Sequence, residues 1–298
     1  LDERLKQAYE QKQRLYIQVH VSYKYRTAPP EWVYKSGVPM VKGAVDTRKK
    51  WAVNIKKSKP KESIYPYWLD SNFITYYKEM VAALGTHLRN EIPSHLQKII
   101  SFVRVDCGIH GDDRPYDVVS SIPAKYKISK SEWMDFKFMA FETYKKAFQE
   151  GAGPIIPLMF KHAAPKKYKA EWNWIQQNIK HSYGVRYLGD VRGHHFTASQ
   201  LTTDQFRDMA VDSDAGIFSR NEMDRAWLSP MAQKNLPLYF YWTAVEQLHP
   251  GLSIWDILRG GVESAEKGKY EFAFDFFNRW AAELVPATAG GGFCIFHE

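Results

Sequence analysis

Apolar residues follow two alternating patterns along the chain: continuous runs of strand length, and runs with helical spacing. Continuous runs predict strands, and five fit well: residues 14–22, 98–106, 154–162, 183–191 and 215–220. Two further runs, residues 252–257 and 291–298, fit a strand less regularly. Helical spacing predicts helices over residues 1–11, 71–88, 131–148, 169–180, 202–211, 236–248 and 270–284. Residues 23–69 show neither pattern and are predicted to be irregular.

Two of the predicted helices begin near a serine, and one shows a clear apolar face. Serine oxygens accept hydrogen bonds from the free N–H groups of a first helical turn. We therefore expect Ser71 and Ser131 to be N-caps. In the first helix, Leu1, Leu5 and Ala8 fall on one side and predict the face that it buries.

Strand and helix alternate over the whole length, which predicts parallel βαβ units. A closed (β/α)8 TIM barrel needs eight strands, whereas this chain opens on a helix and offers fewer. The predicted fold is therefore an α/β TIM barrel that lacks its first two strands in this chain. No linker or repeat divides the sequence, so residues 1–298 are predicted to form a single catalytic barrel domain, a fragment truncated at its N-terminus.

Composition narrows the classes of protein and of partner. The net charge of +8 suits an anionic polymer, a nucleic acid or a membrane surface. Aromatic residues make up 15% of the chain, which fits sugar-binding platforms as well as core packing. Two cysteines exclude a disulfide framework and a four-cysteine zinc site. No apolar run is long enough to cross a bilayer, and residues 1–11 fit an amphipathic helix rather than a signal peptide.

Functional residues are expected where the predicted strands end, because parallel barrels carry their active sites there. Asp112, within Gly-Ile-His-Gly-Asp-Asp, and Glu222, within Ser-Arg-Asn-Glu-Met-Asp, follow two different strands. A retaining glycosidase needs two facing carboxylates, one as acid/base and one as nucleophile. The other candidates, predicted to bind substrate, are His20, Trp32, His110, Asp113, Arg114, His162, Arg192, His194, His195, Arg220 and Asn221.

Other interpretations of these residues were weighed. Asp112 and Asp113 could simply shape a turn, since Gly-Asp-Asp is common turn chemistry. His194 and His195 are adjacent and would point opposite ways in an extended chain, so no metal is predicted. Glycine-rich phosphate loops and GxSxG are absent, so no nucleotide, other cofactor or serine nucleophile is predicted. Cys107 fits a small buried thiol better than a nucleophile.

Three stretches resemble clan-A glycoside hydrolases, especially the family 42 β-galactosidase type: residues 1–33, 76–88 and 99–113. The resemblance implies that residues 14–22 are the third barrel strand, and that residues 215–224 contain the seventh. That family carries its acid/base after strand four and its nucleophile after strand seven. The resemblance therefore implies Asp112, with Asp113 as the alternative, for the first role and Glu222 for the second. The chain departs from the family after strand four, where Cys107-Gly108 replaces Asn-Glu.

The expected function is a glycoside hydrolase that cleaves a β-linked, galactan-type polysaccharide, sulfated or otherwise anionic, with retention. Arg26, Arg114, Arg192 and Arg220 would hold sulfate through forked hydrogen bonds, or would pair with local Asp and Glu. The expected partner is a polysaccharide or oligosaccharide, without nucleic acid or a membrane span, and the expected location is secreted or periplasmic. Two other classes stay open: a non-catalytic carbohydrate-binding barrel, favoured by the missing Asn-Glu, and a nucleic-acid-associated protein, favoured by charge alone.

Overall fold

The computed structural model describes residues 1–21, 29–44, 62–109, 114–161, 168–181, 183–187, 218–222 and 253–256. Two compact units make up the chain. The sheet unit comprises Leu1–Ile17, Ile92–Val103 and Pro154–Glu298, and the helical unit comprises Gln18–Glu91 and Arg104–Gly153. The expectation of one catalytic domain over the whole chain stays a prediction.

A parallel sheet characterises the sheet unit. Its strands are β1 (Leu15–Ile17), β4 (Ile100–Val105), β5 (Leu158–Lys161), β6 (Tyr183–Tyr187), β7 (Phe218–Glu222) and β8 (Ser253–Asp256). They lie in the order β1-β4-β5-β6-β7-β8, and the pairs β1/β4, β5/β6, β6/β7 and β7/β8 are parallel. This order confirms the predicted α/β class with a parallel sheet. Among the described strands no pairing joins β1 to β8, so no closed barrel is seen there.

The sequence of β4 explains its place inside the sheet. All six of its residues are buried, including Arg104 near its end. A parallel strand that is covered on both faces has a nearly continuous apolar sequence, which is the pattern of residues 98–106. Between β5 and β6, α6 (Lys169–Asn178) provides the helical crossover that a parallel pair needs.

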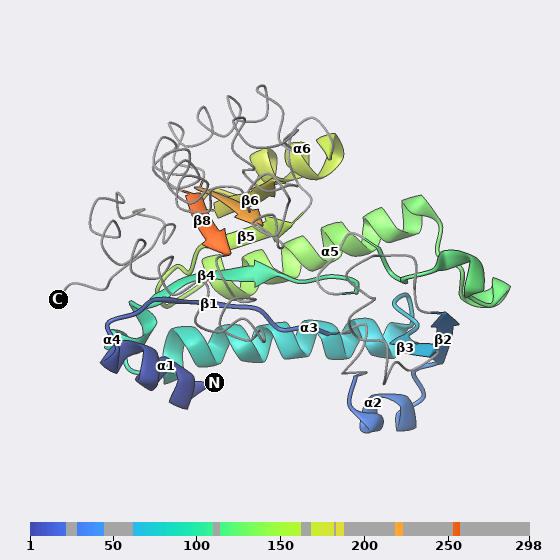
Figure 1. Ribbon diagram of the computed structural model, residues 1–298, viewed down its shortest axis with the longest axis horizontal. Helices are drawn as coiled ribbons and strands as arrows, with labels where there is room; N and C mark the ends of the chain where they lie inside the picture. Colours follow the sequence, from blue (N-terminus) through green and yellow to red (C-terminus); the bar gives the residue numbers. More distant parts are fainter. Residues whose placement is uncertain are drawn as a thin grey trace, which may run out of the picture. The chain divides into compact units, whose positions relative to one another are not determined.

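Near the N-terminus, α1 (Asp2–Glu10) packs beside α4 (Ser94–Gln97) (Figure 1). α1 buries Leu5 and Ala8, as predicted. Leu1 is 51% exposed, so its predicted place on the buried face was wrong. Leu1 is the N-cap residue and precedes the first helical turn, so helical periodicity does not determine where its side chain lies.

A small antiparallel sheet in the helical unit, β2 (Met40–Ala44) and β3 (Glu62–Pro66), was not predicted. Exposed and buried residues alternate along β2 and through most of β3. Gly43 occupies a buried position of β2, and a Cβ there would lie 2.6 Å from Ile122 Cδ1. Because glycine, which has no side chain, takes one buried position of β2, the apolar alternation is too weak to read. The prediction of irregular structure over residues 23–69 was wrong for both strands.

Two long helices run side by side in the helical unit (Figure 1). They are α3 (Ser71–Thr86), which continues into the π-helical turn η2 (His87–Glu91), and α5 (Lys130–Gln149). Shorter elements accompany them: α2 (Glu31–Lys35) and the 3-10 turns η3 (Val119–Ser121) and η4 (Ala124–Tyr126). Of the helices within the described ranges, none combines the length and apolar character needed to cross a membrane.

The observed N-caps of the two long helices lie one and two residues before the predicted ones. Asp70 caps α3, because its carboxylate accepts hydrogen bonds from the N–H groups of the second and third helical residues. Ser129 caps α5: its Oγ accepts from the N–H of Glu132 at 3.2 Å, and the Glu132 carboxylate accepts from the N–H of Ser129 at 2.8 Å. These hydrogen bonds lower the pKa of Glu132. Ser71 and Ser131 as caps were therefore wrong.

Helices α3 and α5 come into close contact where Gly85 faces Ala147. A Cβ on Gly85 would lie 2.5 Å from the carbonyl oxygen of Ala147, so only glycine allows this approach. One turn further on, the buried guanidinium of Arg89 binds four carbonyl oxygens around the end of α5. These belong to Ala147 (3.0 Å), Glu150 (2.6 Å), Gly151 (3.3 Å) and Gly153 (3.2 Å). Arg89 thereby satisfies carbonyls that the end of a helix leaves without partners.

Aromatic side chains form much of the core of the helical unit. Trp68 is fully buried, and its ring makes edge contacts with Phe73, Trp133 and Phe136 at centroid distances of 5.3–5.6 Å. The Trp68 Nε1–H donates to the carbonyl oxygen of Pro115 at 2.9 Å, so burial leaves its polar group satisfied. Core packing therefore accounts for part of the aromatic excess.

The two serines at the start of α5 allow a matched test of the cap. We expect Ser129→Ala to lower the free energy of unfolding by about 1 kcal/mol, because an N–H of the first turn loses its acceptor. Ser131→Ala should change it by less than about 0.5 kcal/mol, because Ser131 is exposed and already helical. Urea unfolding of both variants measures the difference. Equal costs, or a larger cost at Ser131, would contradict the assignment of Ser129 as the cap.

Candidate functional site

Four polar side chains come together in the helical unit, just where the chain leaves β1 and β4. Gln18 and His20 follow β1, while Arg104 and Asp106 lie at the end of β4 and directly after it. The Arg104 Nη1–H donates to Gln18 Oε1 at 2.8 Å, and Gln18 Nε2 donates to Asp106 Oδ2 at 2.9 Å. His20 Nδ1 lies 3.1 Å from the same Asp106 oxygen. We call these four residues the strand-end cluster.

Asp106 is the buried member of the strand-end cluster. Its side chain has no exposed surface, whereas the His20 side chain keeps 33% of its surface exposed. A buried acidic group is stable only with hydrogen-bonding or charged partners, and Gln18 and His20 supply them to Oδ2. The other oxygen, Oδ1, is also buried and has no hydrogen-bond partner within the described part of the chain. The contacts of Oδ2 are therefore the main compensation for burying this group.

The backbone of Asp106 is held by the long helices. The Tyr77 hydroxyl, from α3, donates to the carbonyl oxygen of Asp106 at 2.6 Å. The Tyr144 ring, from α5, packs 6.5 Å from the Tyr77 ring. Burial raises the pKa of both tyrosines well above the ordinary value, so both hydroxyls stay protonated and able to donate. Asp106 is thus fixed by both its side chain and its main chain.

Three predicted site residues have described side chains. His20 belongs to the strand-end cluster. Trp32, on α2, is 55% exposed, and its ring makes an edge contact with Tyr76 at 5.1 Å. Arg114 lies 3.6 Å from the buried carboxylate of Asp117, which matches the alternative in which the arginines pair with local acids.

The remaining predicted residues fall into two groups. Arg220, Asn221 and Glu222 lie within β7, which ends at Glu222 rather than at Arg220. In the register of β7 with β8, Glu222 is paired with Asp256, the last residue of β8, which the sequence analysis did not single out. The others lie outside the described residues: His110, Asp112, Asp113, His162, Arg192, His194 and His195.

Gln18, Arg104 and Asp106 were missed by the sequence analysis, although a signal for them exists. Gln-Val-His ends one apolar run and Arg-Val-Asp ends the next. Residues two apart lie on the same face of an extended chain, so each run presents a pair of polar side chains on one face. Cys107, which follows Asp106, is buried with its thiol outside any disulfide, as expected for a small core residue.

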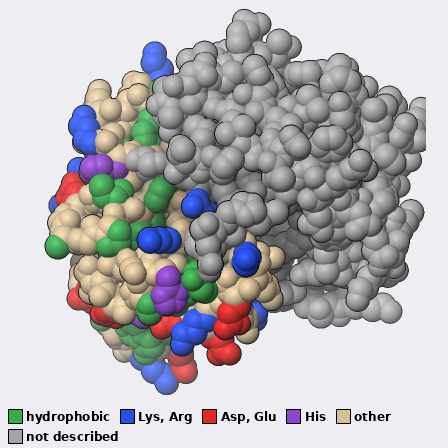
Figure 2. Space-filling model, turned by 90° about the vertical axis from the view of Figure 1, so that its left-hand side faces the viewer, with side chains coloured by type: hydrophobic (Ala, Val, Ile, Leu, Met, Phe, Trp, Pro, Cys, Tyr) green, Lys and Arg blue, Asp and Glu red, His purple; other side chains and the backbone are tan. Residues whose placement is uncertain are grey.

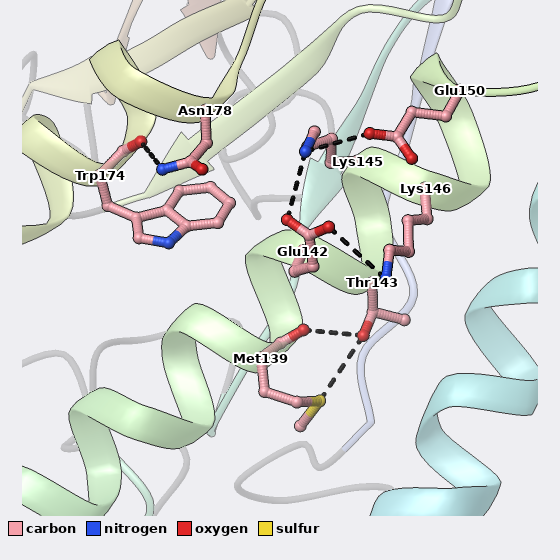
Figure 3. Close-up of polar contacts among 8 residues, drawn as sticks. All are labelled: Met139, Glu142, Thr143, Lys145, Lys146, Glu150, Trp174 and Asn178. Carbon is pink, nitrogen blue, oxygen red and sulfur yellow. Dashed lines mark hydrogen bonds and ion pairs between the residues drawn. The ribbon is translucent and has the colours of Figure 1, made fainter.

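A groove of about 550 Å³ lies between α3 and α5. Charged side chains of α5 and of Glu150, just after it, pair with one another along this groove (Figure 3). Glu142 contacts Lys145 at 3.3 Å and Lys146 at 3.6 Å, and Lys145 also contacts Glu150 at 3.0 Å. The hydrogen bond to Glu150 and the neighbouring Glu142 raise the pKa of Lys145. These ion pairs within one helix and its end are typical of a solvated helix face.

Charge on the described surface is mixed. On the face shown in Figure 2, Lys and Arg side chains are interspersed with Asp and Glu rather than gathered into one basic patch. The Lys-rich stretch within residues 47–63 lies almost entirely outside the described residues. Within the described ranges, no group of three or more His, Cys, Asp or Glu side chains has the arrangement of a metal site.

Comparisons with known proteins return no match. No protein-family model matches the chain, and neither curated proteins nor solved structures give one. The resemblance to clan-A glycoside hydrolases therefore depends on the stretches of sequence alone, and the function has to be argued from the residues themselves.

The support of Asp106 by Tyr77 can be tested against another buried tyrosine. We expect Tyr77→Phe to lower the free energy of unfolding by about 1–2 kcal/mol, because the buried carbonyl of Asp106 loses this donor. Tyr34→Phe is the control, because the Tyr34 hydroxyl is buried with no hydrogen-bond partner among the described residues. Removing it should be neutral or slightly stabilising. Thermal unfolding of both variants gives the comparison, and equal effects would contradict the role of Tyr77.

Proposed function

We propose that the protein is a glycoside hydrolase. The observation that supports this most is the strand-end cluster, in which a His–Asp pair follows two adjacent parallel strands. Active sites of parallel α/β proteins lie at the carboxyl ends of their strands. The sequential strand order also accords with the further proposal that the sheet belongs to a (β/α)8 barrel, because barrel strands follow one another in chain order.

The proposed mechanism uses Asp112 as acid/base and Glu222 as nucleophile. Asp112 protonates the leaving glycosidic oxygen while Glu222 attacks the anomeric carbon, so the glycosidic bond breaks as a glycosyl ester forms. Asp112 then takes a proton from water, and the resulting attack on the ester releases the sugar and regenerates Glu222 with retention. His20 is proposed to bind a sugar hydroxyl.

The proposed substrate is a β-linked galactan with sulfate or another acidic group. The net charge of +8 favours an anionic polymer. Trp32 adds support, because an exposed indole ring offers a flat apolar surface to a sugar. Since the Arg114 guanidinium lies near Asp117, the other three arginines, Arg26, Arg192 and Arg220, are the stronger candidates for binding sulfate. A secreted or periplasmic location would suit such a substrate.

Reducing ends released from sulfated and neutral galactans measure the proposed activity. Asp112→Asn should lower kcat/KM by about 10²–10⁴-fold, the usual contribution of a general acid. Glu222→Gln should lower kcat by about 10⁴-fold or more, as the loss of other enzymatic nucleophiles does. Asp224→Asn is the matched control, because that residue follows Glu222 closely and has no proposed role in the reaction.

Azide distinguishes the nucleophile from a residue that merely supports the site. With Glu222→Ala and an activated galactoside, azide should restore turnover by attacking the anomeric carbon in the vacated space. Glycan binding without release of product would replace the hydrolase with a non-catalytic carbohydrate-binding barrel. Salt-sensitive capture of DNA or RNA, with no glycan bound, would replace it with a nucleic-acid-binding protein.

A further inference from the structure

We propose that Asp106 is a positioning residue that holds His20 in the tautomer with hydrogen on Nδ1, so that Nε2 accepts a hydrogen bond from a hydroxyl of the substrate. The orientation of His20 is argued from the strand-end cluster alone. Only the identity of the ligand, a sugar hydroxyl, rests on the proposed function.

The contact with Arg104 determines how the Gln18 amide is oriented. An arginine side chain only donates hydrogen bonds, so the Gln18 atom 2.8 Å from Arg104 Nη1 is the carbonyl oxygen, Oε1. The amide nitrogen therefore faces the other way, where it donates to Asp106 Oδ2 at 2.9 Å. Asp106 Oδ2 thus accepts a hydrogen bond from Gln18 and lies beside His20.

The neighbours of His20 Nδ1 indicate whether this nitrogen carries a hydrogen. It lies 3.1 Å from Asp106 Oδ2 and 3.3 Å from Gln18 Nε2. A bare Nδ1 would place its lone pair 3.1 Å from Asp106 Oδ2, which is itself an acceptor. A protonated Nδ1 instead donates to that oxygen, which also gives the buried carboxyl group a second donor. A bare Nδ1 could accept a hydrogen bond from Gln18 Nε2 at 3.3 Å, but it would then face the acceptor oxygen of Asp106 at 3.1 Å. The shorter contact therefore favours the Nδ1–H form of His20.

The side chains of His20 and Asp106 differ in exposure. Asp106 has no exposed surface, and His20 keeps 33% of its side-chain surface exposed. A ligand can therefore reach His20 while Asp106 stays inside. In neutral imidazole with hydrogen on Nδ1, Nε2 is the acceptor, and its natural partner on a sugar is a hydroxyl group. Asp106 would thus act on the substrate only through His20.

Nitrogen NMR on the full chain tests the tautomer without any substrate. With 15N-labelled histidine at about pH 8, where an ordinary imidazole is neutral, His20 should show a protonated Nδ1 and a bare Nε2. Loss of the signal in His20→Gln assigns it among the ten histidines. Asp106→Asn should shift the population toward the Nε2–H form, because an amide N–H can donate to Nδ1. Gln18→Met is the control and should keep the wild-type tautomer.

An Nε2–H form in the wild-type protein would overturn the proposal, and this result does not depend on whether Asp106→Asn folds. An unchanged tautomer in a folded Asp106→Asn protein would overturn it equally. With a sulfated galactan oligosaccharide as the probe, the His20 Nε2 signal should shift on binding. Binding or cleavage that leaves this signal unmoved would remove His20 from the site.

Kinetics separate positioning from a direct role once cleavage is measured. Asp106→Asn should lower kcat/KM about 10-fold, the loss expected for one charge-assisted hydrogen bond. In a His20→Gln background the same change should cost less than about 2-fold, because Asp106 acts through His20. Full additivity would contradict this role. If no glycan is bound or cleaved, the proposed function is wrong, and so is the sugar hydroxyl as the ligand of His20. The NMR result still shows whether Asp106 determines the tautomer of His20.

Discussion

The burial of the Asp106 side chain is the constraint on which the rest of the candidate site depends. An acidic side chain without exposed surface must be compensated by nearby polar groups, and here both residues that contact Oδ2 come from the segment after β1. That requirement joins two parts of the chain that lie 88 residues apart. It also determines how Gln18 is oriented and which nitrogen of His20 faces inward. One desolvated group therefore organises the whole cluster.

Support for that group extends into the two long helices. Tyr77 of α3 holds the Asp106 carbonyl, and Tyr144 of α5 packs against Tyr77. The helices can take these positions only because Gly85 lets them come into backbone contact. The precision of a functional site depends on the residues behind it, and here those residues belong to the aromatic core. The core that stabilises the helical unit thus also keeps the strand-end cluster in place.

Local patterns in the sequence predict several of the helices and strands, but not the contacts between distant residues. The apolar run of β4, the long helices and the parallel order follow from periodicity and alternation. The sheet of β2 and β3 is hidden because Gly43, at a buried position of β2, has no apolar side chain. The strand predicted over residues 14–22 covers only Leu15–Ile17 in the structure. The side chains of Gln18 and His20, just after it, contact Asp106 instead of continuing the strand pairing. The polar pairs that make up the strand-end cluster can be found in the sequence. Their contacts with one another could not be predicted, since they join residues 86–88 positions apart. The roles of Asp112 and Glu222 stay predictions.

The hydrogen bonds of Arg89 to the carbonyl groups at the end of α5 affect the order in which the chain folds. The four carbonyls that it binds lie 58–64 residues further along the chain. Partners this distant meet only after a large loop has closed, which is a slow and entropically costly event. The beginning of α5 can form from its own neighbouring residues, whereas its end is completed only by tertiary assembly. The two ends of one helix therefore belong to different stages of folding.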